Sequence, residues 1–309
     1  MPEVVVGIPT FRRPRSLERL LTALERLETD ARVSVVVADN DAENHEGYDL
    51  CQALQAHGFR WPLEAVIVEQ RGIAQVRNAL VGRALTDPQA QFMAMLDDDE
   101  WPSPQWLECF LRVQEQTGAD ALQGTIVFEF ATAPKTWARG FDGISSIKRA
   151  TGPVAMLEGA GNLLLTRACL ESLQWPWFDP EFALSGGEDR DFFERLAQAQ
   201  KRFAWADEAI AYTIVPEVRK SLRWTLERAY SIGNTDMRIF LKHHATPRRR
   251  IKEFGKIALA LLLSPILLVI LAAIPNRAAD MLRRFVRNLG KVAALLGQHY
   301  NEYAVTHGE

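Results

Sequence analysis

Four consecutive acidic residues, Asp97-Asp98-Asp99-Glu100, follow a short apolar run at 92–96 and are the strongest chemical signal in the sequence. Carboxylates packed within one turn repel one another, and divalent cations such as Mg²⁺ or Mn²⁺, which prefer oxygen ligands, relieve that repulsion. Ligands also gather at the carboxyl ends of strands in open α/β sheets. The stretch alone leaves two interpretations open: a cation site, or a solvated acidic turn before a helix expected near Pro104.

Glu188 and Asp189 form a second acidic group, placed just after two glycines and at the start of a helix expected at 188–200. The dipole of that helix would stabilise carboxylates in its first turn, which is one explanation for them. The other is catalysis, because an attacking hydroxyl group must lose its proton to a positioned base. Aromatic residues precede the glycines and could either stack on a sugar ring or pack in the core: Trp175, Trp177 and Phe178.

Polar residues also follow two other expected strands, with Pro9-Thr10 after 4–8 and Asp39 after 33–38. If these strands are parallel, their ends meet the acidic run at one edge of the sheet. Asp39 could accept a hydrogen bond from a ribose hydroxyl or a base N–H, or it could cap a turn. The sequence therefore indicates a polar edge where a nucleotide could bind.

Arg71 and Arg77 flank the start of a helix expected at 72–84. Arginine at such a place can contact a phosphate or a base, although surface arginines are common. Neither G-x-G-x-x-G nor G-x-x-x-x-G-K-[ST] is present, which argues against dehydrogenases and P-loop enzymes. A diphosphate would then need another source of positive charge, and a cation held by the acidic run supplies it.

Strand and helix patterns alternate through the first half of the chain and predict parallel βαβ units. Further strands and a helix follow in a less regular second half, and its polar stretch at 135–152 is a candidate for specificity. The expected strands are 4–8, 33–38, 63–69, 92–96, 121–130, 162–166 and 203–212, and the expected helices include 17–27, 46–57, 72–84, 188–200 and 222–243.

The bulk composition fits a cytosolic protein with a sizeable core. The chain has 309 residues, of which 48% are hydrophobic. Its three cysteines, Cys51, Cys109 and Cys169, lie far apart without metal-ligand spacing, as expected of reduced thiols. The first residues lack the basic and apolar regions of a signal peptide, so we expect none.

The last part of the chain, 248–309, has a different character, with ten Lys or Arg against four Asp or Glu. It contains an uncharged run, 257–274, which is at the short end for a spanning helix and is interrupted by Pro265. After Pro275 an apolar stripe with basic residues elsewhere is typical of an interfacial amphipathic helix. Basic residues on both sides of the run disfavour a simple crossing. We expect a re-entrant or in-plane membrane hairpin bent near Pro265; a buried hairpin or a dimer interface is the alternative.

Six motifs, in this order along the chain, resemble the family 2 glycosyltransferases of the GT-A fold. Each is weak alone, but the ordered set is specific and covers about residues 3–240. The resemblance implies an α/β fold with a Rossmann-like, mixed but mainly parallel sheet flanked by helices. It suggests a glycosyltransferase domain at 1–247, and the basic and apolar tail at 248–309, which lies outside the resemblance, is expected to be a membrane-association segment. The motifs are VVVGIPTFRR, VVVADN, RGIAQVRN, LDDDE, GAGNLLL and GGEDRDF.

The resemblance also implies roles for individual residues in an inverting, metal-dependent hexosyl transfer from a nucleotide-sugar, expected to be a UDP-sugar. Asp189 would be the catalytic base, with Glu188 beside it orienting the acceptor. Asp99 and Asp97 would hold Mg²⁺ or Mn²⁺. The residues expected at the nucleotide and its diphosphate are Pro9, Thr10, Arg12, Asp39, Arg77, Asp97 and Asp98.

The helix at 222–243 resembles the family's late helix, which can close over the diphosphate. Arg223, Trp224 and Arg228 are candidates for that role, and a packed helix with exposed arginines explains them at least as well. His243 and His244 end this helix, where histidines usually favour its dipole, and we exclude them from the metal site.

Membrane residence would suit a polyprenyl-diphosphate-linked saccharide acceptor, and we expect a monotopic or peripheral enzyme of bacterial surface polysaccharide synthesis on the cytoplasmic side of the inner membrane. No nucleic-acid partner is expected. A sugar nucleotidyltransferase would share the fold class and the metal, but should carry a Gly-rich basic loop after the first strand, which Gly7-Ile-Pro-Thr-Phe does not supply. A noncatalytic membrane-associated carbohydrate-binding or assembly subunit is the other alternative.

Overall fold

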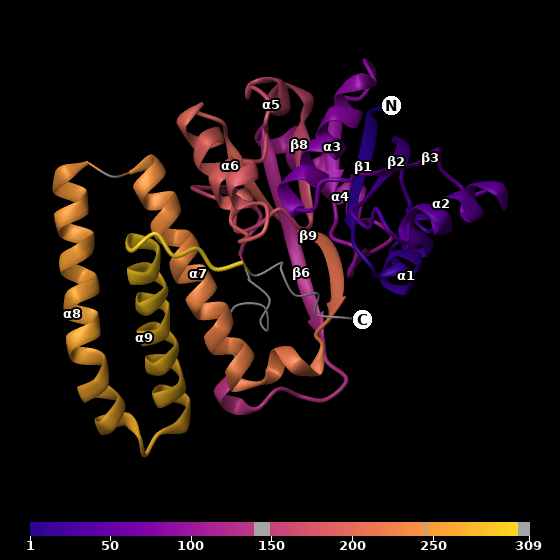
Figure 1. The fold of residues 1–309 in the computed structure, drawn as a ribbon. Coiled ribbons are helices and arrows are strands. Elements are labelled where there is room, and N and C mark those ends of the chain that lie inside the picture. Colours follow the sequence, from indigo (N-terminus) through magenta and orange to yellow (C-terminus); the bar gives the residue numbers. More distant parts are fainter. Residues whose placement is uncertain (139–148, 245, 302–309) are drawn as a thin grey trace.

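The computed structural model describes residues 1–138, 149–244 and 246–301. Within these ranges, nine strands form one mixed sheet with helices on both faces (Figure 1). The strand order is β3-β2-β1-β4-β8-β6-β9-β5, and β7 pairs with β9. Most of the polar stretch 135–152 and the end of the tail, 302–309, lie outside the described residues.

The first half confirms the predicted βαβ units. The register places Thr10 of β1 opposite Asp39 of β2, and β4 runs parallel to β1 on its other side, so the carboxyl ends of these strands form one edge. The elements are β1 (Glu3–Thr10), α1 (Pro14–Leu24), β2 (Arg32–Asp39), α2 (Glu46–Ala56), β3 (Leu63–Ile67), α3 (Ile73–Thr86) and β4 (Phe92–Met95).

The second half makes the sheet mixed, because β8 runs antiparallel to both β4 and β6. The segments that the sequence did not predict, β5, β7 and α5, are too short to show a period. The elements are β5 (Glu100–Pro102), α4 (Trp106–Thr117), β6 (Ala121–Glu129), β7 (Gly152–Val154), β8 (Leu163–Thr166), α5 (Arg167–Glu171), α6 (Glu188–Gln198) and β9 (Phe203–Ile214), with short 3₁₀ turns η1 (Thr136–Ala138), η2 (Pro180–Phe182) and η3 (Glu217–Lys220).

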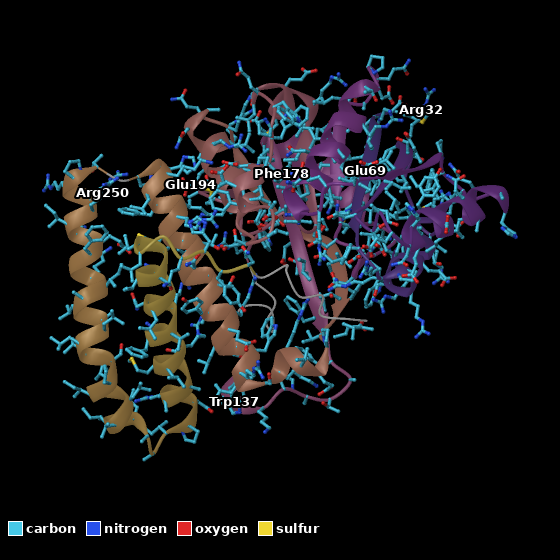
Figure 2. The ribbon with its side chains drawn as sticks, in the orientation of Figure 1. Arg32, Glu69, Trp137, Phe178, Glu194 and Arg250 are labelled. Atoms are coloured by element: carbon cyan, nitrogen blue, oxygen red, sulfur yellow. The ribbon has the colours of Figure 1, made fainter. Side chains whose placement is uncertain are left out.

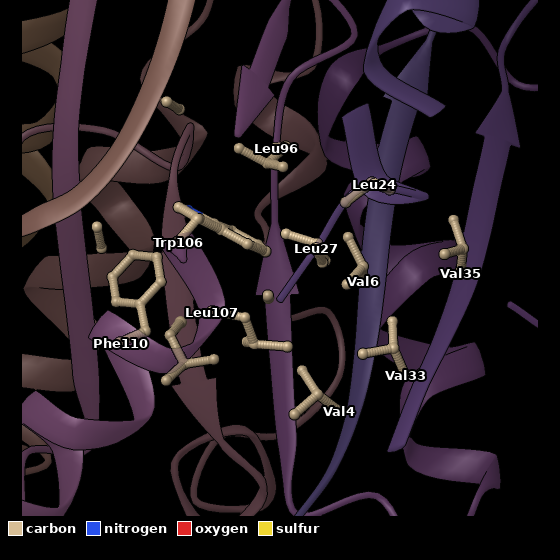
Figure 3. Packing of buried hydrophobic residues seen from close by; sticks show 14 of the residues in the cluster. Val4, Val6, Leu24, Leu27, Val33, Val35, Leu96, Trp106, Leu107 and Phe110 are labelled. Carbon is tan, nitrogen blue, oxygen red and sulfur yellow. The ribbon is translucent and has the colours of Figure 1, made fainter. Parts of the chain in front are cut away.

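The core lies on both faces of the sheet, as the alternating side chains of its strands require. Val4 and Val6 of β1 face one cluster, which includes Leu96 and Trp106 (Figure 3), while Val5 faces the other. Because β1 is buried on both faces, its sequence reads as a continuous apolar run. This central strand ends at the polar edge and fixes the position of Thr10.

Three C-terminal helices form a layer beside the sheet, α7 (Leu222–His243), α8 (Pro247–Leu271) and α9 (Pro275–Leu295). Helix α9 lies between α7 and α8, and α8 is outermost (Figure 1). At the α7–α9 crossing, a Cβ on Gly290 would lie 2.1 Å from the Tyr230 carbonyl oxygen, and Gly233 meets the backbone of Arg287 equally closely. The tail is therefore packed on the helix that lines the cavity described below.

The hairpin of the tail does not bend where the sequence predicted. Helix α8 continues through Pro265, and the chain reverses after Leu271 instead. Proline inside a helix removes only one backbone hydrogen bond, and α8 continues in spite of this loss at Pro265. Pro275 instead occupies the first turn of α9, where no such bond is lost, and the chain reverses just before it. The expectation of a bend near Pro265 was therefore wrong.

We predict that Gly290→Ala lowers the free energy of unfolding by about 1–3 kcal/mol, because the added methyl group overpacks the α7–α9 crossing. Gly255→Ala on α8 is the matched control, since a Cβ there meets no atom within 4 Å. It should raise stability by about 0.5–1 kcal/mol through helix propensity. Chemical denaturation of both variants measures the difference, and equal effects would contradict close packing at Gly290.

Candidate active site

A cavity of about 350 Å³ opens at the carboxyl ends of β1, β2 and β4. The first half of the chain contributes Pro9, Thr10 and Asn40 to its wall, together with the acidic run. The facing wall comes from β6, β9, η3 and α7, which supply Ile126, Phe128, Thr213, Arg219, Trp224 and Arg228. The polar edge expected from the sequence is thus one side of a cleft between the two halves of the sheet.

The acidic run divides into inward and outward carboxylates. Asp98 is buried, and its Oδ2 accepts a hydrogen bond from the Thr10 hydroxyl at 2.9 Å. Glu100 is also buried, and its Oε2 accepts the backbone N–H groups of Asp97 (3.3 Å) and Asn162 (3.1 Å). The side chains of Asp97 and Asp99 remain 37% and 24% exposed. The run therefore combines two buried acids that stabilise the turn with two partly exposed acids, and all four line the cavity.

Arginines from two distant parts of the chain compensate these charges. Arg13, just before α1, places Nη1 3.2 Å from both Asp98 Oδ1 and Asp99 Oδ2. Arg219 of η3 lies 3.8 Å from the same oxygen of Asp99. Burial raises the pKa of Asp98 to about 7, although Arg13 opposes this shift. Because burial disfavours each additional negative charge, the acidic run depends on these guanidinium groups.

Arg77 connects the two acidic groups that the sequence singled out. Its guanidinium is buried between Asp97, at 3.0 Å, and Glu188 of α6, with which it forms an ion pair. The Glu188 carboxyl is fully buried, which raises its pKa to about 8, and Arg77 opposes that shift. Arg77 also lines the cavity. The residue expected at the nucleotide thus also holds the start of α6 against the end of β4.

The start of α6 presents Asp189 close to Gly159. Gly186 and Gly187 have φ values of +74° and +93°, which favour glycine, and a Cβ on Gly187 would lie 1.9 Å from Thr235 Cγ2. Asp189 is half-buried, and a Cβ on Gly159 would be 3.5 Å from its Oδ2. The two glycines bring α6 against α7, and Gly159 leaves space before the Asp189 carboxylate.

Two of the residues expected at the nucleotide lie behind or outside the cavity wall. Asp39 is fully buried, and its carboxylate accepts the backbone N–H groups of Asp41 (2.9 Å) and Tyr48 (3.0 Å). Its neighbour Asn40 lines the cavity instead. Arg12 points away and pairs with Asp41 at 3.0 Å and Glu43 at 2.7 Å. Asp39 therefore supports the backbone behind the cavity wall, and the ion-pair partners of Arg12 lie outside the cavity.

The aromatic residues before α6 do not line this cavity. Phe178 is buried in the interior (Figure 2) and stacks on Phe192 with ring centroids 4.5 Å apart, and Trp177 donates its ring N–H to the Leu170 carbonyl. Trp175 is 71% exposed. Core packing accounts for Phe178, and the cavity takes its aromatic lining from Phe11, Phe128 and Trp224 instead.

The late helix, α7, contributes two of its three candidate residues to the cavity. Trp224 and Arg228 line the cavity, while the side chain of Arg223 is 87% exposed and pairs with Glu227 at 2.8 Å. At the other end, His243 lies 2.7 Å from Asp191 and His244 lies 2.9 Å from Glu194. These histidines join the C-terminal end of α7 to α6.

Arg13 and Arg219 were not predicted as site residues from the sequence. Arg13 directly precedes Pro14 at the first turn of α1, so it lies in the short connection between β1 and α1, near the strand ends. Pro14 marks this connection in the sequence, and the position of Arg13 could have been predicted from it. Arg219 lies in a 3₁₀ turn without a period, and no pattern in the sequence connects it to Asp99. Both residues line the cavity.

Asp97 and Asp99 fit a divalent cation that takes its other ligands from phosphate and water. In the described ranges, no group of three or more His, Cys, Asp or Glu side chains could hold a metal ion. Mg²⁺ in particular is usually bound by one or two carboxylates together with substrate phosphates. Two partly exposed carboxylates on a cavity wall match that donor set.

Comparisons with known proteins show the family of this chain. The glycosyl transferase family 2 profile matches residues 5–172. Succinoglycan biosynthesis protein ExoM of Rhizobium meliloti (strain 1021) is 31% identical over 258 residues, which cover 82% of this chain and 79% of ExoM.

Solved structures share the fold at low sequence identity. The mannosyltransferase PcManGT from Pyrobaculum calidifontis, in complex with GDP-Man and Mn²⁺, has a TM-score of 0.62 and 17% identity over 96% of this chain and 88% of that chain. Residues 1–349 of S. aureus TarS, in complex with UDP-GlcNAc, have a TM-score of 0.51 and 14% sequence identity. The match covers 97% of this chain and 93% of that chain. The GT-A-like fold is therefore confirmed.

We predict that Glu188 makes stability fall as pH rises. Its pKa in the folded protein is about 8 against an ordinary 4.5, so between these values the folded protein holds a proton that the unfolded chain releases. The free energy of unfolding should therefore decrease through this window. Glu188→Gln should flatten the decrease, and Glu181→Gln, an exposed carboxyl group, should not. Parallel pH profiles of Tm for all three proteins would contradict the assignment.

Proposed function

Because the chain belongs to glycosyl transferase family 2, we propose that it transfers a sugar from a nucleotide-sugar, a UDP-sugar, to a hydroxyl group of a saccharide acceptor with inversion at the anomeric carbon. The biological setting that we propose is bacterial polysaccharide synthesis, as the name of the relative ExoM suggests. UDP-GlcNAc bound to TarS supports the choice of nucleotide, and the observation that carries the proposal is the cavity itself.

The cavity contains groups that could bind the donor, and Asp189 lies outside its lining. Pro9, Thr10 and Asn40 form the wall at the ends of β1 and β2, where the nucleoside would bind. Asp97 and Asp99 would hold Mg²⁺ or Mn²⁺ beside the diphosphate. A bound cation supplies charge neutralisation of the departing nucleoside diphosphate. The remaining tasks belong to side chains of the protein.

Asp189 is the proposed general base. Its carboxylate would accept the proton of the acceptor hydroxyl as that oxygen attacks the anomeric carbon, and the nucleoside diphosphate would leave on the opposite side. Glu188 and Arg77 set the position of Asp189, because their buried ion pair joins the first turn of α6 to Asp97. Contacts between charged side chains thus link the proposed base to the proposed leaving-group site.

The acceptor that we propose is a polyprenyl-diphosphate-linked saccharide at the cytoplasmic face of the inner membrane. Among the described helices, α8 is long and apolar enough to cross a membrane, and only 11% of its apolar window is buried. Large apolar side chains on α8 face outward, with Leu262 68% and Val269 78% exposed. This surface supports membrane association through the segment 248–309.

Helix α9 favours an in-plane position for α8 rather than a crossing. It packs against α7 and α8 along its length and carries Arg277, Arg283 and Arg284, which a spanning hairpin would bring into the hydrocarbon region. The first turns of α8 carry exposed basic side chains: Arg248, Arg249, Arg250, which is labelled in Figure 2, and Lys252. Anionic headgroups attract such residues by about 1 kcal/mol each.

A donor panel tests the proposed activity directly. The full chain is incubated with UDP- and GDP-sugars and Mn²⁺ or Mg²⁺, with and without lipid-linked acceptor, and release of the nucleoside diphosphate is measured. Turnover of one donor supports the proposal. Absence of turnover on every donor, with acceptor present, would favour the noncatalytic alternative, and release of pyrophosphate from a sugar phosphate and UTP would favour a nucleotidyltransferase.

We predict that Asp189→Asn lowers the transfer rate by about 10²- to 10⁴-fold, the usual contribution of a general base. Binding of UDP, measured by calorimetry, should not change. Asp49→Asn, which removes an exposed carboxylate on α2, should leave both unchanged. Wild-type turnover in Asp189→Asn would remove this residue from its proposed role.

We predict that Leu262→Glu combined with Val269→Glu prevents binding to vesicles that contain anionic lipid, because both exposed side chains would enter the apolar boundary. Gln52→Glu with Gln55→Glu on α2 adds the same charge to another exposed surface and should leave vesicle binding intact. Flotation measures binding, while donor hydrolysis in solution should be the same for all. Equal flotation of the α8 variant would contradict membrane docking through α8.

A further inference from the structure

We propose that Arg13 and Arg219 exchange partners during donor binding: they pair with Asp99 before the donor and cation bind, and with the donor diphosphate afterwards. The exchange would make binding of the nucleotide and of the cation mutually dependent. This inference rests on the proposed function, since it requires a nucleoside diphosphate donor. It concerns Arg13, which lies in the first motif but received no role there, and Arg219, which lies outside the motifs.

One carboxylate oxygen carries both ion pairs. Asp99 Oδ2 lies 3.2 Å from Arg13 Nη1 and 3.8 Å from Arg219 Nη2. Asp99 is also the acid that we expect to bind the cation. A cation on this oxygen would place two positive charges beside each guanidinium, and like charges at such distances repel. Cation binding must therefore weaken the pairs that Arg13 and Arg219 make with Asp99.

Both arginines can turn to a new anion in the same cavity. Each lines the cavity, and their side chains are 21% and 22% exposed, so both reach the space where a donor would lie. The Nε of Arg219 is buried and has no hydrogen-bond partner in the described part of the chain. A guanidinium presents a planar fork of donors that matches phosphate oxygens. A diphosphate would satisfy this donor and replace the lost carboxylate.

The two arginines approach from opposite walls. Arg13 precedes α1 in the first half of the sheet, and Arg219 belongs to η3 between β9 and α7. Arg219 also stands over the Trp224 ring, with its guanidinium carbon 5.9 Å from the ring centroid. A diphosphate held by both would join the two walls, and every charge would remain compensated throughout the exchange.

The test is a calorimetric titration of UDP into the full chain, with and without saturating Mn²⁺. The readout is the factor by which Mn²⁺ tightens UDP binding. In wild type this factor combines the direct attraction between cation and diphosphate with release of the arginines. In Arg13→Gln and in Arg219→Gln we expect the factor to shrink by about fivefold or more, the lower end of typical coupling between sites. Mn²⁺ alone should bind these variants more tightly than wild type.

Arginines outside the cavity provide matched controls. Arg83→Gln and Arg112→Gln remove the same charge from exposed side chains that pair with Glu64 and Glu208, and should leave the factor at its wild-type value. Thermal unfolding identifies any variant that fails to fold, and the remaining single variant then decides the question. GDP serves as a second nucleotide probe.

A static role for the arginines would give a different result. If Arg13 and Arg219 contact the diphosphate without leaving Asp99, the variants lose UDP affinity equally with and without Mn²⁺, the factor stays constant, and the exchange is refuted. An unchanged or weakened affinity for Mn²⁺ alone would refute it as well. Failure of the proposed function looks different, because wild type itself would then bind neither UDP nor GDP with Mn²⁺ present.

Discussion

The structure depends on compensation of the negative charge that gathers where β4 ends. Asp97, Asp98, Asp99 and Glu100 follow one another in a partly buried turn. Groups from separate elements compensate them, including a hydroxyl from β1, guanidiniums from the start of α1, from α3 and from η3, and the backbone N–H of Asn162. Since leaving any buried carboxylate without a partner is costly, these elements must meet at this point.

The same network links the proposed chemistry to the C-terminal helices. Arg77 holds α6 against the acidic run, and α7 holds α6 from the other side through His243 and Asp191. Helix α7 also lines the cavity at Trp224 and packs against α9 at Gly233. An enzyme docked on a lipid surface through α8 would therefore have its cavity in a fixed orientation to that surface. This arrangement suits an acceptor that is itself anchored in the membrane.

The sequence predicted those features that repeat or have a local cause. Alternating apolar runs located β1 to β4 and their helices, because burial on both faces leaves a continuous apolar pattern. The acidic residues at the end of β4 indicated where the cavity lies. The antiparallel direction of β8 and the short β5 and β7 depend on tertiary pairing, which no local pattern encodes.

The prediction of individual site residues was limited by side-chain direction. The positions of Thr10, Asp97 and Asp99 could be predicted, because each residue lies at or just after the end of a strand, and the strand fixes the position of its end. The placement of Asp39 beneath Asn40 depends on the packing of α2, and the choice between Arg12 and Arg13 depends on one backbone turn with φ of +54° at Arg12. Arg219 comes from the other half of the chain, and its position at the cavity depends on the fold of the whole sheet.

We propose that the outward carboxylates at the end of β4 hold a cation for the donor diphosphate. The most direct measurement is the affinity for UDP with and without Mn²⁺ in wild type and in Asp99→Asn, with Asp49→Asn as control. We expect Mn²⁺ to tighten UDP binding in wild type and in the control, and to have little effect on Asp99→Asn. Full enhancement by Mn²⁺ in Asp99→Asn would contradict this proposal.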